Sequence, residues 1–393
     1  MPSKKTGIFL LTLIFLYGAQ GVLYKGGNQF TQILLFLILF ISGIYLVKTL
    51  SSSTPLPKFL KYWVLLLGLN VFGFILTGSL SDSIHFSMIR GILISLLTFF
   101  PIYSLAQYGL IQRKHLIILF LCFTPVFIQN WLIQSADIYS EFGKEEIVNN
   151  VSYTLILLIP YLFLFKKRKY IAYGILLLII YFVILGSKRG AIIVGGIGVL
   201  FYFYQQVRFD NVKKNLIGYF VGLVALIGVL IYGYQFYLQN EYLISRFEQL
   251  EEGNSSGREE IYANIFSNWA NSESLFNIFF GYGFAGSRQL SGKALAHNDW
   301  IELLSDFGLL GVVIYIFFFY HVFKYAIKLN VQSQYRLMLL CILTMWFATS
   351  LFSMGYVSND GYLRSIILGY ILGISNPKRS VSNNHIYTYK KNS

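Results

Sequence analysis

A short polar segment near residue 300 carries the residue types that acid–base chemistry needs. The segment AHNDWIELLSDFGLLG, residues 296–311, stands where a long polar stretch returns to a hydrophobic run. Ionisable groups at a membrane boundary cost free energy unless they face protein or water, so they are candidates for function. Within the segment, His297 is the candidate catalytic residue, because imidazole has a pKa near neutrality and can act as a general base.

The acidic residues of the same segment share one face of the helix that the hydrophobic run predicts. Asp299, Glu302 and Asp306 are spaced i, i+3 and i+7, which places them along one side of a helix. We expect one of them to orient the imidazole of His297 or to raise its basicity, and we take Asn298, Asp299 and Glu302 as supporting residues. The alternative is that His297 caps the helix and bonds to a neighbouring carboxylate without any part in chemistry.

Two arginines are candidates for binding an anion. Arg189 begins a predicted helix after the turn Gly-Ser-Lys, and Arg258 lies in the first turn of another predicted helix. The helix dipole disfavours a cation at this end, but free N–H groups together with a guanidinium bind phosphate strongly. The two arginines are therefore predicted to hold a pyrophosphate, the head of a lipid carrier. The alternatives are an ion pair between Arg258 and a nearby glutamate, and, for Lys188 beside Arg189, a snorkelling side chain.

The composition indicates the environment in which these residues work. The chain has 393 residues, of which 56% are hydrophobic and 12% are charged, whereas about 25% of a soluble domain is charged. Apolar runs recur that are long enough to cross a bilayer, which takes about 20 residues. We expect an all-α polytopic membrane protein with about twelve transmembrane helices. The predicted ranges are 7–23, 30–47, 59–79, 84–107, 116–133, 148–165, 170–186, 190–204, 215–238, 300–322, 335–354 and 360–374.

The distribution of charge predicts the orientation of the chain. The net charge is +14, but the basic residues gather in short loops on one side of the predicted spans, which is typical of cytoplasmic loops and not of nucleic-acid binding. Both termini are thus predicted to be cytoplasmic, and the long loop at 239–299 to be extracytoplasmic. Residues 1–374 form one integral membrane domain, and residues 375–393 form a basic tail that we expect to be disordered in the cytoplasm.

The long loop contains one predicted helix of its own. The pattern S-x-x-E at Ser256 to Glu259 is a capping box, and Ile261, Ile265 and Trp269 follow at a spacing of four residues. We expect an amphipathic helix of about fourteen residues that lies against the membrane surface or the mouth of the bundle. Further along, Gly281-Tyr282-Gly283 breaks the chain, and a second glycine-rich turn leads to His297.

Neither a metal site nor a cofactor site is predicted. Cys122 and Cys341 lie inside predicted spans, so the chain has no disulfide framework and no cysteine spacing typical of metal ligands. The carboxylates of residues 296–311 are the one cluster that could hold a metal ion. We therefore expect chemistry that depends on side chains of the protein.

Three motifs in order resemble those of the O-antigen ligase/polymerase superfamily of bacterial membrane glycosyltransferases. They are GSKRGA at 186–191, SGREEIYANIFSNW at 256–269 followed by GYGFAGS at 281–287, and AHNDWIELLSDFGLLG at 296–311. The resemblance covers about residues 180–315, and the amino-terminal spans match in hydropathy. In this family, tryptophan or another aromatic residue often follows the loop arginine. This chain has Tyr262 there, which is a mild departure from the pattern.

The resemblance implies a reaction and a place for it. Members transfer a glycan from an undecaprenyl-pyrophosphate donor at the outer face of the inner membrane without a metal ion. By resemblance, Arg189 and Arg258 bind the pyrophosphate and His297 activates the acceptor hydroxyl. The partners implied are lipid-linked oligosaccharides as donor and acceptor, the bilayer, and a flippase and chain-length regulator of the same pathway.

Three functions remain to be distinguished. We favour a polymerase of lipid-linked repeat units, which makes O-antigen or capsular polysaccharide, by analogy of size and aromatic content. A ligase that transfers the glycan to lipid A-core uses the same chemistry on another acceptor. A polysaccharide transporter or flippase is a different class, which predicts internal symmetry and polar residues in mid-membrane, and the chain shows no such symmetry.

The predicted topology can be tested by labelling. A single cysteine placed at Asn254, in a variant whose native cysteines are replaced, should react with a membrane-impermeant maleimide in intact cells or spheroplasts, because residue 254 lies in the predicted outer loop. Reaction only after lysis would reverse the orientation and move the candidate site to the cytoplasmic side.

Overall fold

The protein is described by a computed structural model, which is helical wherever it assigns regular structure. It describes residues 3–24, 26–51, 56–142, 148–165, 169–209, 258–292 and 294–377, with a few helical positions between 227 and 244. The predicted span at 215–238, the capping residues Ser256 and Gly257 and most of the basic tail lie outside this description. Within the described ranges there is no β-strand, so the expected all-α class is confirmed.

The first half of the described chain forms helices that follow the predicted ranges. They are α1 (Lys4–Gly18), α2 (Gln29–Leu50), α3 (Lys58–Thr77), α4 (Ser83–Leu97), α5 (Phe99–Gln107), α6 (Arg113–Phe142), α7 (Val151–Ile156) and α8 (Ile159–Leu162). The range 148–165 was expected to be one span, but it is made of two short helices joined by turns. Pro160 lies at the start of α8 and has no N–H to donate to a continuous helix.

The second half contains the motifs. Its helices are α9 (Lys169–Leu185), α10 (Arg189–Phe209), α13 (Arg258–Ala270), α14 (Leu275–Phe280), α15 (Gly286–Ser291), α16 (Asp299–Lys328), α17 (Gln334–Phe352) and α18 (Gly361–Ile374). The break at GSKRG separates α9 from α10, as predicted.

Seven of the described helices are long and apolar enough to cross a membrane. They are α2, α3, α4 taken together with α5, α6, α10, α16 and α17. Three further apolar segments, which are α7 with α8, α9, and α18, are shorter. The polytopic character is therefore clear, and the count of twelve spans stays a prediction.

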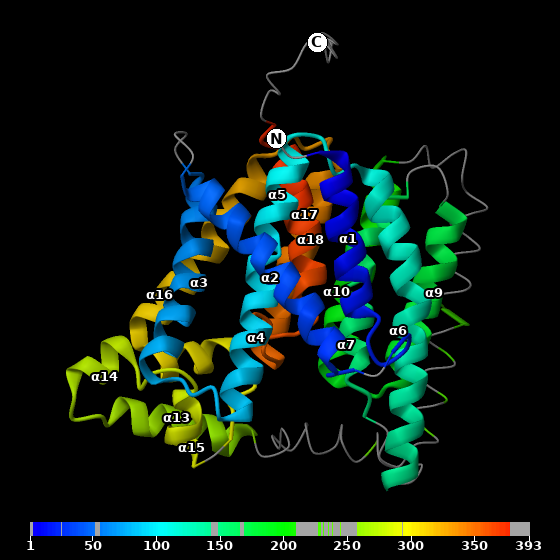
Figure 1. The fold of residues 1–393 in the computed structure, drawn as a ribbon. Coiled ribbons are helices and arrows are strands. Elements are labelled where there is room, and N and C mark those ends of the chain that lie inside the picture. The colour runs from blue at the N-terminus through cyan, green and yellow to red at the C-terminus, as the bar shows by residue number, and fades with distance from the viewer. Residues whose placement is uncertain are drawn as a thin grey trace.

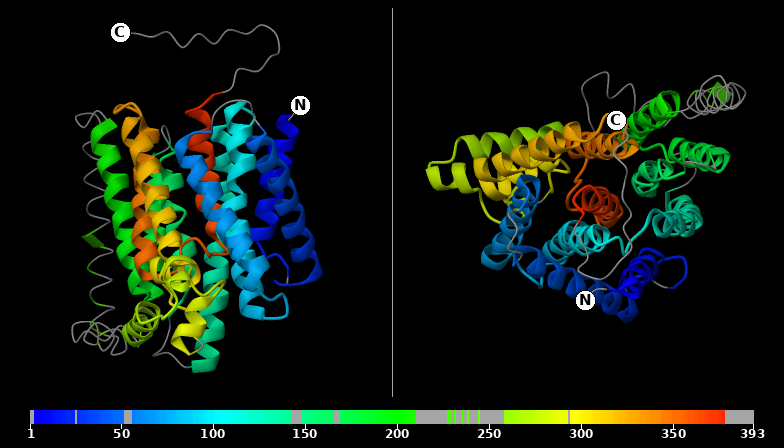
Figure 2. Two further views of the ribbon diagram at one scale, coloured as in Figure 1. Left: turned by 90° about the vertical axis from the view of Figure 1, so that its left-hand side faces the viewer. Right: turned by 90° about the horizontal axis from the view of Figure 1, so that it is seen from above.

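The short helix α18 lies at the centre of the bundle. Seen along the bundle, the other long helices surround it (Figure 2), and every residue from Gly361 to Gly373 is buried. A helix that is apolar on all sides is expected to be enclosed. Because α18 is short, the non-helical segment before it, residues 353–360, lies inside the bundle, and the start of α18 is part of the wall of a cavity.

The outer-loop helices lie at one end of the bundle. Figure 1 shows α13, α14 and α15 together at this end, while the start of α1 and the end of α18 lie at the opposite end. A salt bridge of 2.8 Å between Arg288 of α15 and Asp82, before α4, also places Asp82 at the loop end. Arg288 keeps the pKa of Asp82 at about 2, so the pair stays charged. This arrangement agrees with the predicted separation of the termini from the loop.

The predicted loop helix exists as α13, and its apolar face is covered by the loop itself. Ile265 is fully buried against Leu290 and Ala296, and Ile261 and Trp269 pack beside them. The four-residue spacing therefore identified the correct face. The apolar side of α13 packs on α15 and the start of α16, at the mouth of the bundle.

Helix α16 is interrupted at Gly308. This residue has φ 60° and ψ −153°, a conformation open to glycine and strongly disfavoured for other residues. A Cβ at Gly308 would lie 2.5 Å from the backbone carbon of Phe279 in α14. The interruption lets α14 approach the backbone of α16, and it divides α16 into a first part that belongs to the site and a second part that continues as an apolar helix.

Candidate functional site

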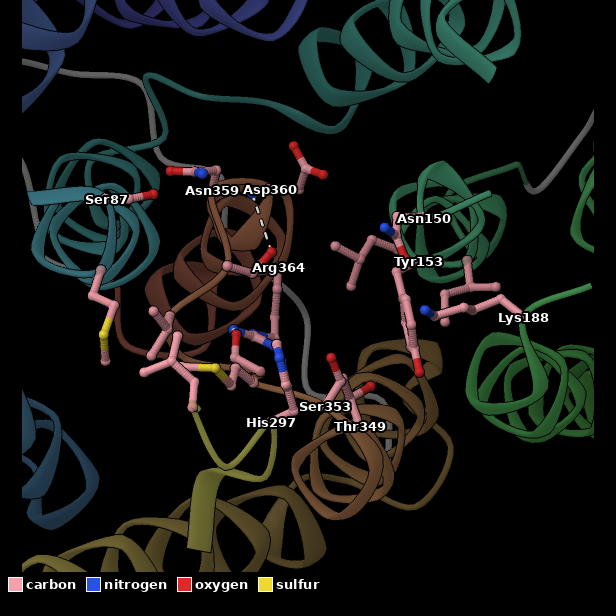
Figure 3. Close-up of a pocket in the computed structure, with 18 of the residues that line it drawn as sticks. Ser87, Asn150, Tyr153, Lys188, His297, Thr349, Ser353, Asn359, Asp360 and Arg364 are labelled. Atoms are coloured by element: carbon pink, nitrogen blue, oxygen red, sulfur yellow. Dashed lines mark hydrogen bonds between the residues drawn. The ribbon is translucent and has the colours of Figure 1, made fainter. Parts of the chain in front are cut away.

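A cavity of about 730 Å³ opens at the loop end of the bundle. Its walls come from α4, α7, the turn before α10, the start of α13, the segment before α16, the end of α17 and residues 353–360. Figure 3 labels many of the polar residues that line it. The charged and titratable lining residues are Lys188, Arg258, His297, Asp360 and Arg364, together with Tyr153. Residues far apart in sequence, two of them predicted site residues, thus meet in one place.

Asn298 determines where α16 begins and places His297 just before it. The side-chain oxygen of Asn298 accepts hydrogen bonds from the backbone of Trp300, at 2.9 Å, and of Ile301, at 3.2 Å. Its amide nitrogen donates to the carbonyl of Leu351 at the end of α17, at 3.0 Å. His297 has φ 52°, a left-handed conformation in which asparagine, aspartate and histidine are enriched. Asn298 thus caps the helix and joins it to α17, and its supporting role in the reaction stays a prediction.

Glu302 and Asp306 bind the loop and do not contact the imidazole. Glu302 accepts hydrogen bonds from the Ser287 hydroxyl, at 2.7 Å, and from the backbone N–H of Ala296, at 2.9 Å. Asp306 accepts one from the backbone N–H of Gly286, at 2.7 Å. Both carboxylates are buried. These two carboxylates therefore bind the Ser287 hydroxyl and backbone N–H groups of the segment that leads to His297.

Asp299 binds the other non-helical segment of the site. Its two oxygens accept hydrogen bonds from the backbone N–H of Gly355 and from the Tyr315 hydroxyl, both at 2.7 Å. The expectation that Asp299 or Glu302 orients the imidazole is therefore replaced by an indirect role. Among the described residues, the imidazole of His297 has no hydrogen-bond partner, and it faces the cavity.

Arg258 lies at the carbonyl end of α17. Its Nη1 donates a hydrogen bond of 2.7 Å to the carbonyl of Phe352, the last residue of that helix. A cation is stabilised at this end of a helix dipole. No ion pair joins Arg258 to a carboxylate in the part of the chain that the structure describes, so the alternative pairing with Glu259 or Glu260 is not observed. Arg258 also lines the cavity.

Lys188 lines the cavity, and its neighbour Arg189 is not among the lining residues. Both come from the GSKRG turn before α10, so the turn does reach the site. Figure 3 shows the Lys188 side chain across the cavity from His297. The sequence pattern favoured the opposite assignment, with Lys188 snorkelling and Arg189 binding the anion. The predicted role of Arg189 stays a prediction, and Lys188 joins the candidates.

Arg364 is a cavity residue that the sequence analysis did not single out. It is 2% exposed, and its guanidinium stacks 3.7 Å above the Trp346 ring. Its Nη2 donates to the carbonyl of Gly355 at 2.6 Å. A signal was present, because an arginine inside an apolar run at 361–374 is expensive unless it is paired and is a candidate for function. Arg364 and Asp299 therefore both bind Gly355 in the segment 353–356, Arg364 at the carbonyl and Asp299 at the backbone N–H.

The surroundings of His297 lower the pKa of its imidazole. The cavity walls remove bulk water from it, and the positive charges of Arg258 and Lys188 oppose its protonation. All three effects favour the neutral ring, so the fraction able to accept a proton at neutral pH rises. A neutral imidazole beside two fixed cations can deprotonate a hydroxyl while the cations stabilise a developing anion. No group of three metal-ligating side chains occurs among the described residues.

Comparison with known families agrees with this geometry. Residues 174–316 match the family model described as O-Antigen ligase, and the matched range includes the GSKRG turn, α13 and the start of α16. The match confirms the resemblance found in the three motifs. A comparison with curated proteins gives no significant match.

The role of Glu302 in holding the loop can be tested by two substitutions. Glu302→Ala leaves the N–H of Ala296 and the Ser287 hydroxyl buried without an acceptor, which costs about 1–3 kcal/mol for each group. Glu302→Gln should keep most of the stability, because its carbonyl oxygen can accept from Ala296 and its NH₂ can donate to Ser287. Thermal unfolding of the purified protein in detergent measures the difference. Equal melting temperatures for the two variants would contradict the role.

Proposed function

We propose that this chain, a membrane protein whose match over residues 174–316 is to the O-antigen ligase family, is a glycosyltransferase with a lipid-pyrophosphate-linked donor. It polymerises undecaprenyl-pyrophosphate-linked repeat units into O-antigen or capsular polysaccharide at the outer face of the bacterial inner membrane. The observation that carries the proposal is the meeting of His297 with Arg258 and Lys188 in one cavity at the loop end.

The donor supplies a good leaving group, and the cavity stabilises it. The anomeric C–O bond to the pyrophosphate breaks while negative charge develops on the pyrophosphate oxygens. Arg258 and Lys188 are fixed cations on the cavity wall, and preorganised charges of this kind stabilise a transition state. Arg189, one residue further along, supports the same anion in this proposal.

His297 activates the acceptor. Its neutral imidazole takes the proton of an acceptor hydroxyl, and the hydroxyl oxygen attacks the anomeric carbon from the face opposite the pyrophosphate. One displacement of this kind inverts the configuration of that carbon. The proton rests on His297 until bulk water removes it, and lipid pyrophosphate is released. The lowered pKa of His297 supports the proposal because it keeps the base available at neutral pH.

The acceptor distinguishes polymerase from ligase. In a polymerase the hydroxyl belongs to another lipid-linked repeat, and in a ligase it belongs to lipid A-core. The proposal of a polymerase rests on the analogy of composition and size, and the ligase is the second candidate. Purified enzyme supplied with lipid-linked repeats alone should form long chains if it is a polymerase. Product that appears only when lipid A-core is added would identify a ligase.

The three basic residues near the cavity can be ranked by substitution. Arg258→Ala should lower transfer about 10²- to 10³-fold, the usual loss when one charge-stabilising donor is removed. Arg258→Lys should restore little, because an ammonium cannot reproduce the two parallel N–H donors of the guanidinium. Lys188→Ala and Arg189→Ala each remove one charge and test which of the two binds pyrophosphate. Transfer is measured in vesicles with radiolabelled lipid-linked donor.

Arg208→Ala is the matched control for these variants. Arg208 lies in the last turn of α10, at the other end of the helix that Arg189 begins, and its Nη1 donates to Tyr204. It should retain normal transfer. Full activity in Arg258→Ala would pass the pyrophosphate role to other residues, and the abundance of each variant in the membrane shows whether a loss reflects folding.

Substitution of His297 separates catalysis from structure. His297→Asn keeps a side chain that tolerates the left-handed backbone at this position but cannot accept a proton, so transfer should fall about 10²- to 10⁴-fold. His297→Gln should be similarly inactive. Wild-type transfer should be constant near neutrality and fall as the pH drops through the pKa of His297, below its ordinary value of about 6.5, because only the neutral ring is a base.

The measurement uses initial rates from pH 4.5 to 8 with purified donor, in parallel with binding of the donor to each variant. We expect the Asn and Gln variants of His297 to bind donor normally. Their residual transfer rate should be low and should no longer fall at acidic pH. Wild-type rates in His297→Gln would leave the histidine with a positioning role.

A further inference from the structure

A second, smaller cavity adjoins the main one. It has a volume of about 220 Å³ and lies between the end of α1, the second half of α6, the start of α7 and the start of α18. Asn150, Asn359 and Asp360 line both cavities. The two cavities are therefore neighbours, and these three side chains form the boundary between them. About 15 Å³ suffices for one water, so the smaller cavity has room for a ring of several polar atoms.

The lining of the smaller cavity differs in chemistry from that of the main cavity. Five of its residues carry side-chain amides, which are Gln20, Asn130, Gln134, Asn150 and Asn359, and no lysine or arginine is among its described lining residues. An amide offers both donors and an acceptor, so it fits a hydroxyl in either role. The rings of Tyr17, Phe127 and Tyr362 provide apolar faces. The set suits an uncharged molecule rich in hydroxyl groups and gives no cation for a phosphate.

Two amides of the smaller cavity lack a partner. The side chains of Asn130 and Gln134, both half-buried on α6, have no hydrogen-bond partner among the described residues. Tyr362 contributes its ring, because its hydroxyl is sealed inside the protein, and a Cβ at Gly18 would overlap that oxygen. The two unpaired amides lie four residues apart on one helix, so both can offer donors and an acceptor to the same ligand.

We infer that the smaller cavity is a binding subsite for one uncharged, hydroxyl-rich sugar ring of the glycan substrate. The inference rests on the proposed function and adds the place where the sugar is recognised. The amides of Asn130 and Gln134 bind the ring hydroxyls, and the aromatic rings of the lining pack on the faces of the sugar. Asp360, which already accepts a hydrogen bond from the Thr154 hydroxyl, has further lone pairs for a sugar hydroxyl at the boundary between the cavities. The main cavity then holds the pyrophosphate and the smaller one a neighbouring sugar.

Binding can be measured without the reaction. The probe is the repeat-unit oligosaccharide released from the lipid-linked donor by mild acid, which carries no pyrophosphate, and the protein is the full chain in nanodiscs. Asn130→Ala and Gln134→Ala should each weaken binding about three- to tenfold, the effect of one neutral hydrogen bond. Gln129→Ala is the matched control, since Gln129 is an exposed amide on the same helix and lines neither cavity. It should bind like the wild type.

Stability distinguishes a subsite from a structural role. Because the amides of Asn130 and Gln134 have no partner among the described residues, both variants should melt at the wild-type temperature without glycan, and the increase in melting temperature that glycan produces should shrink. Unchanged glycan binding in both variants, or no glycan binding by the wild type, overturns the subsite. So does a loss of stability in the two variants that accounts for the weaker binding.

Transfer kinetics then show which glycan occupies the subsite. A raised KM for the acceptor with an unchanged KM for the donor assigns the acceptor ring, and the reverse assigns the donor ring. The two proposals fail separately. Glycan binding that depends on Asn130 and Gln134, without any transfer product, keeps the subsite and rejects the proposed reaction. Normal transfer together with unaltered binding in the variants rejects the subsite alone.

Discussion

The site depends on the need of buried backbone N–H groups for acceptors. Two non-helical segments meet at the cavity, residues 281–298 and 353–360, and neither can satisfy its backbone internally as a helix does. The first part of α16 supplies the acceptors, because Glu302 and Asp306 bind the first segment and Asp299 binds the second. The positions of His297 and of the start of α18 both follow from these bonds. The carboxylates near the histidine therefore build the frame that holds it.

Much of this arrangement was predictable from the sequence, and the failures have definite causes. Apolar runs predicted most of the helices because length and hydropathy alone decide whether a helix can lie in a bilayer. Spacing also predicted that Asp299, Glu302 and Asp306 share a face. It could not identify their partners, because the periodicity of a helix says nothing about which loop folds over it. The expected contact with His297 was the nearest one in sequence, and the observed contacts are with Gly286 and Gly355.

The two basic residues of the GSKRG turn illustrate a second limit. Successive residues of a helix point about 100° apart, so the exact residue at which α10 begins decides which of Lys188 and Arg189 faces the cavity. Sequence patterns locate a helix start to within a few residues. Arg364 was missed for a different reason, since it lies within an apolar run that was interpreted only as a span. The interactions of Arg364 with Trp346 and Gly355 are long-range contacts that only the folded chain brings together.

The break at Gly308 has a consequence for the inheritance of this fold. Every single-nucleotide change at a glycine codon that alters the amino acid introduces a Cβ or a stop, and at this position a Cβ would overlap the backbone of α14. The position is thus closed to gradual change unless α14 moves at the same time. A descendant that lost His297 and its chemistry could keep the bundle intact, but it would still have to keep this glycine. Gly308 therefore constrains the scaffold independently of the reaction, because it lets α14 pass close to α16 and does not line the cavity.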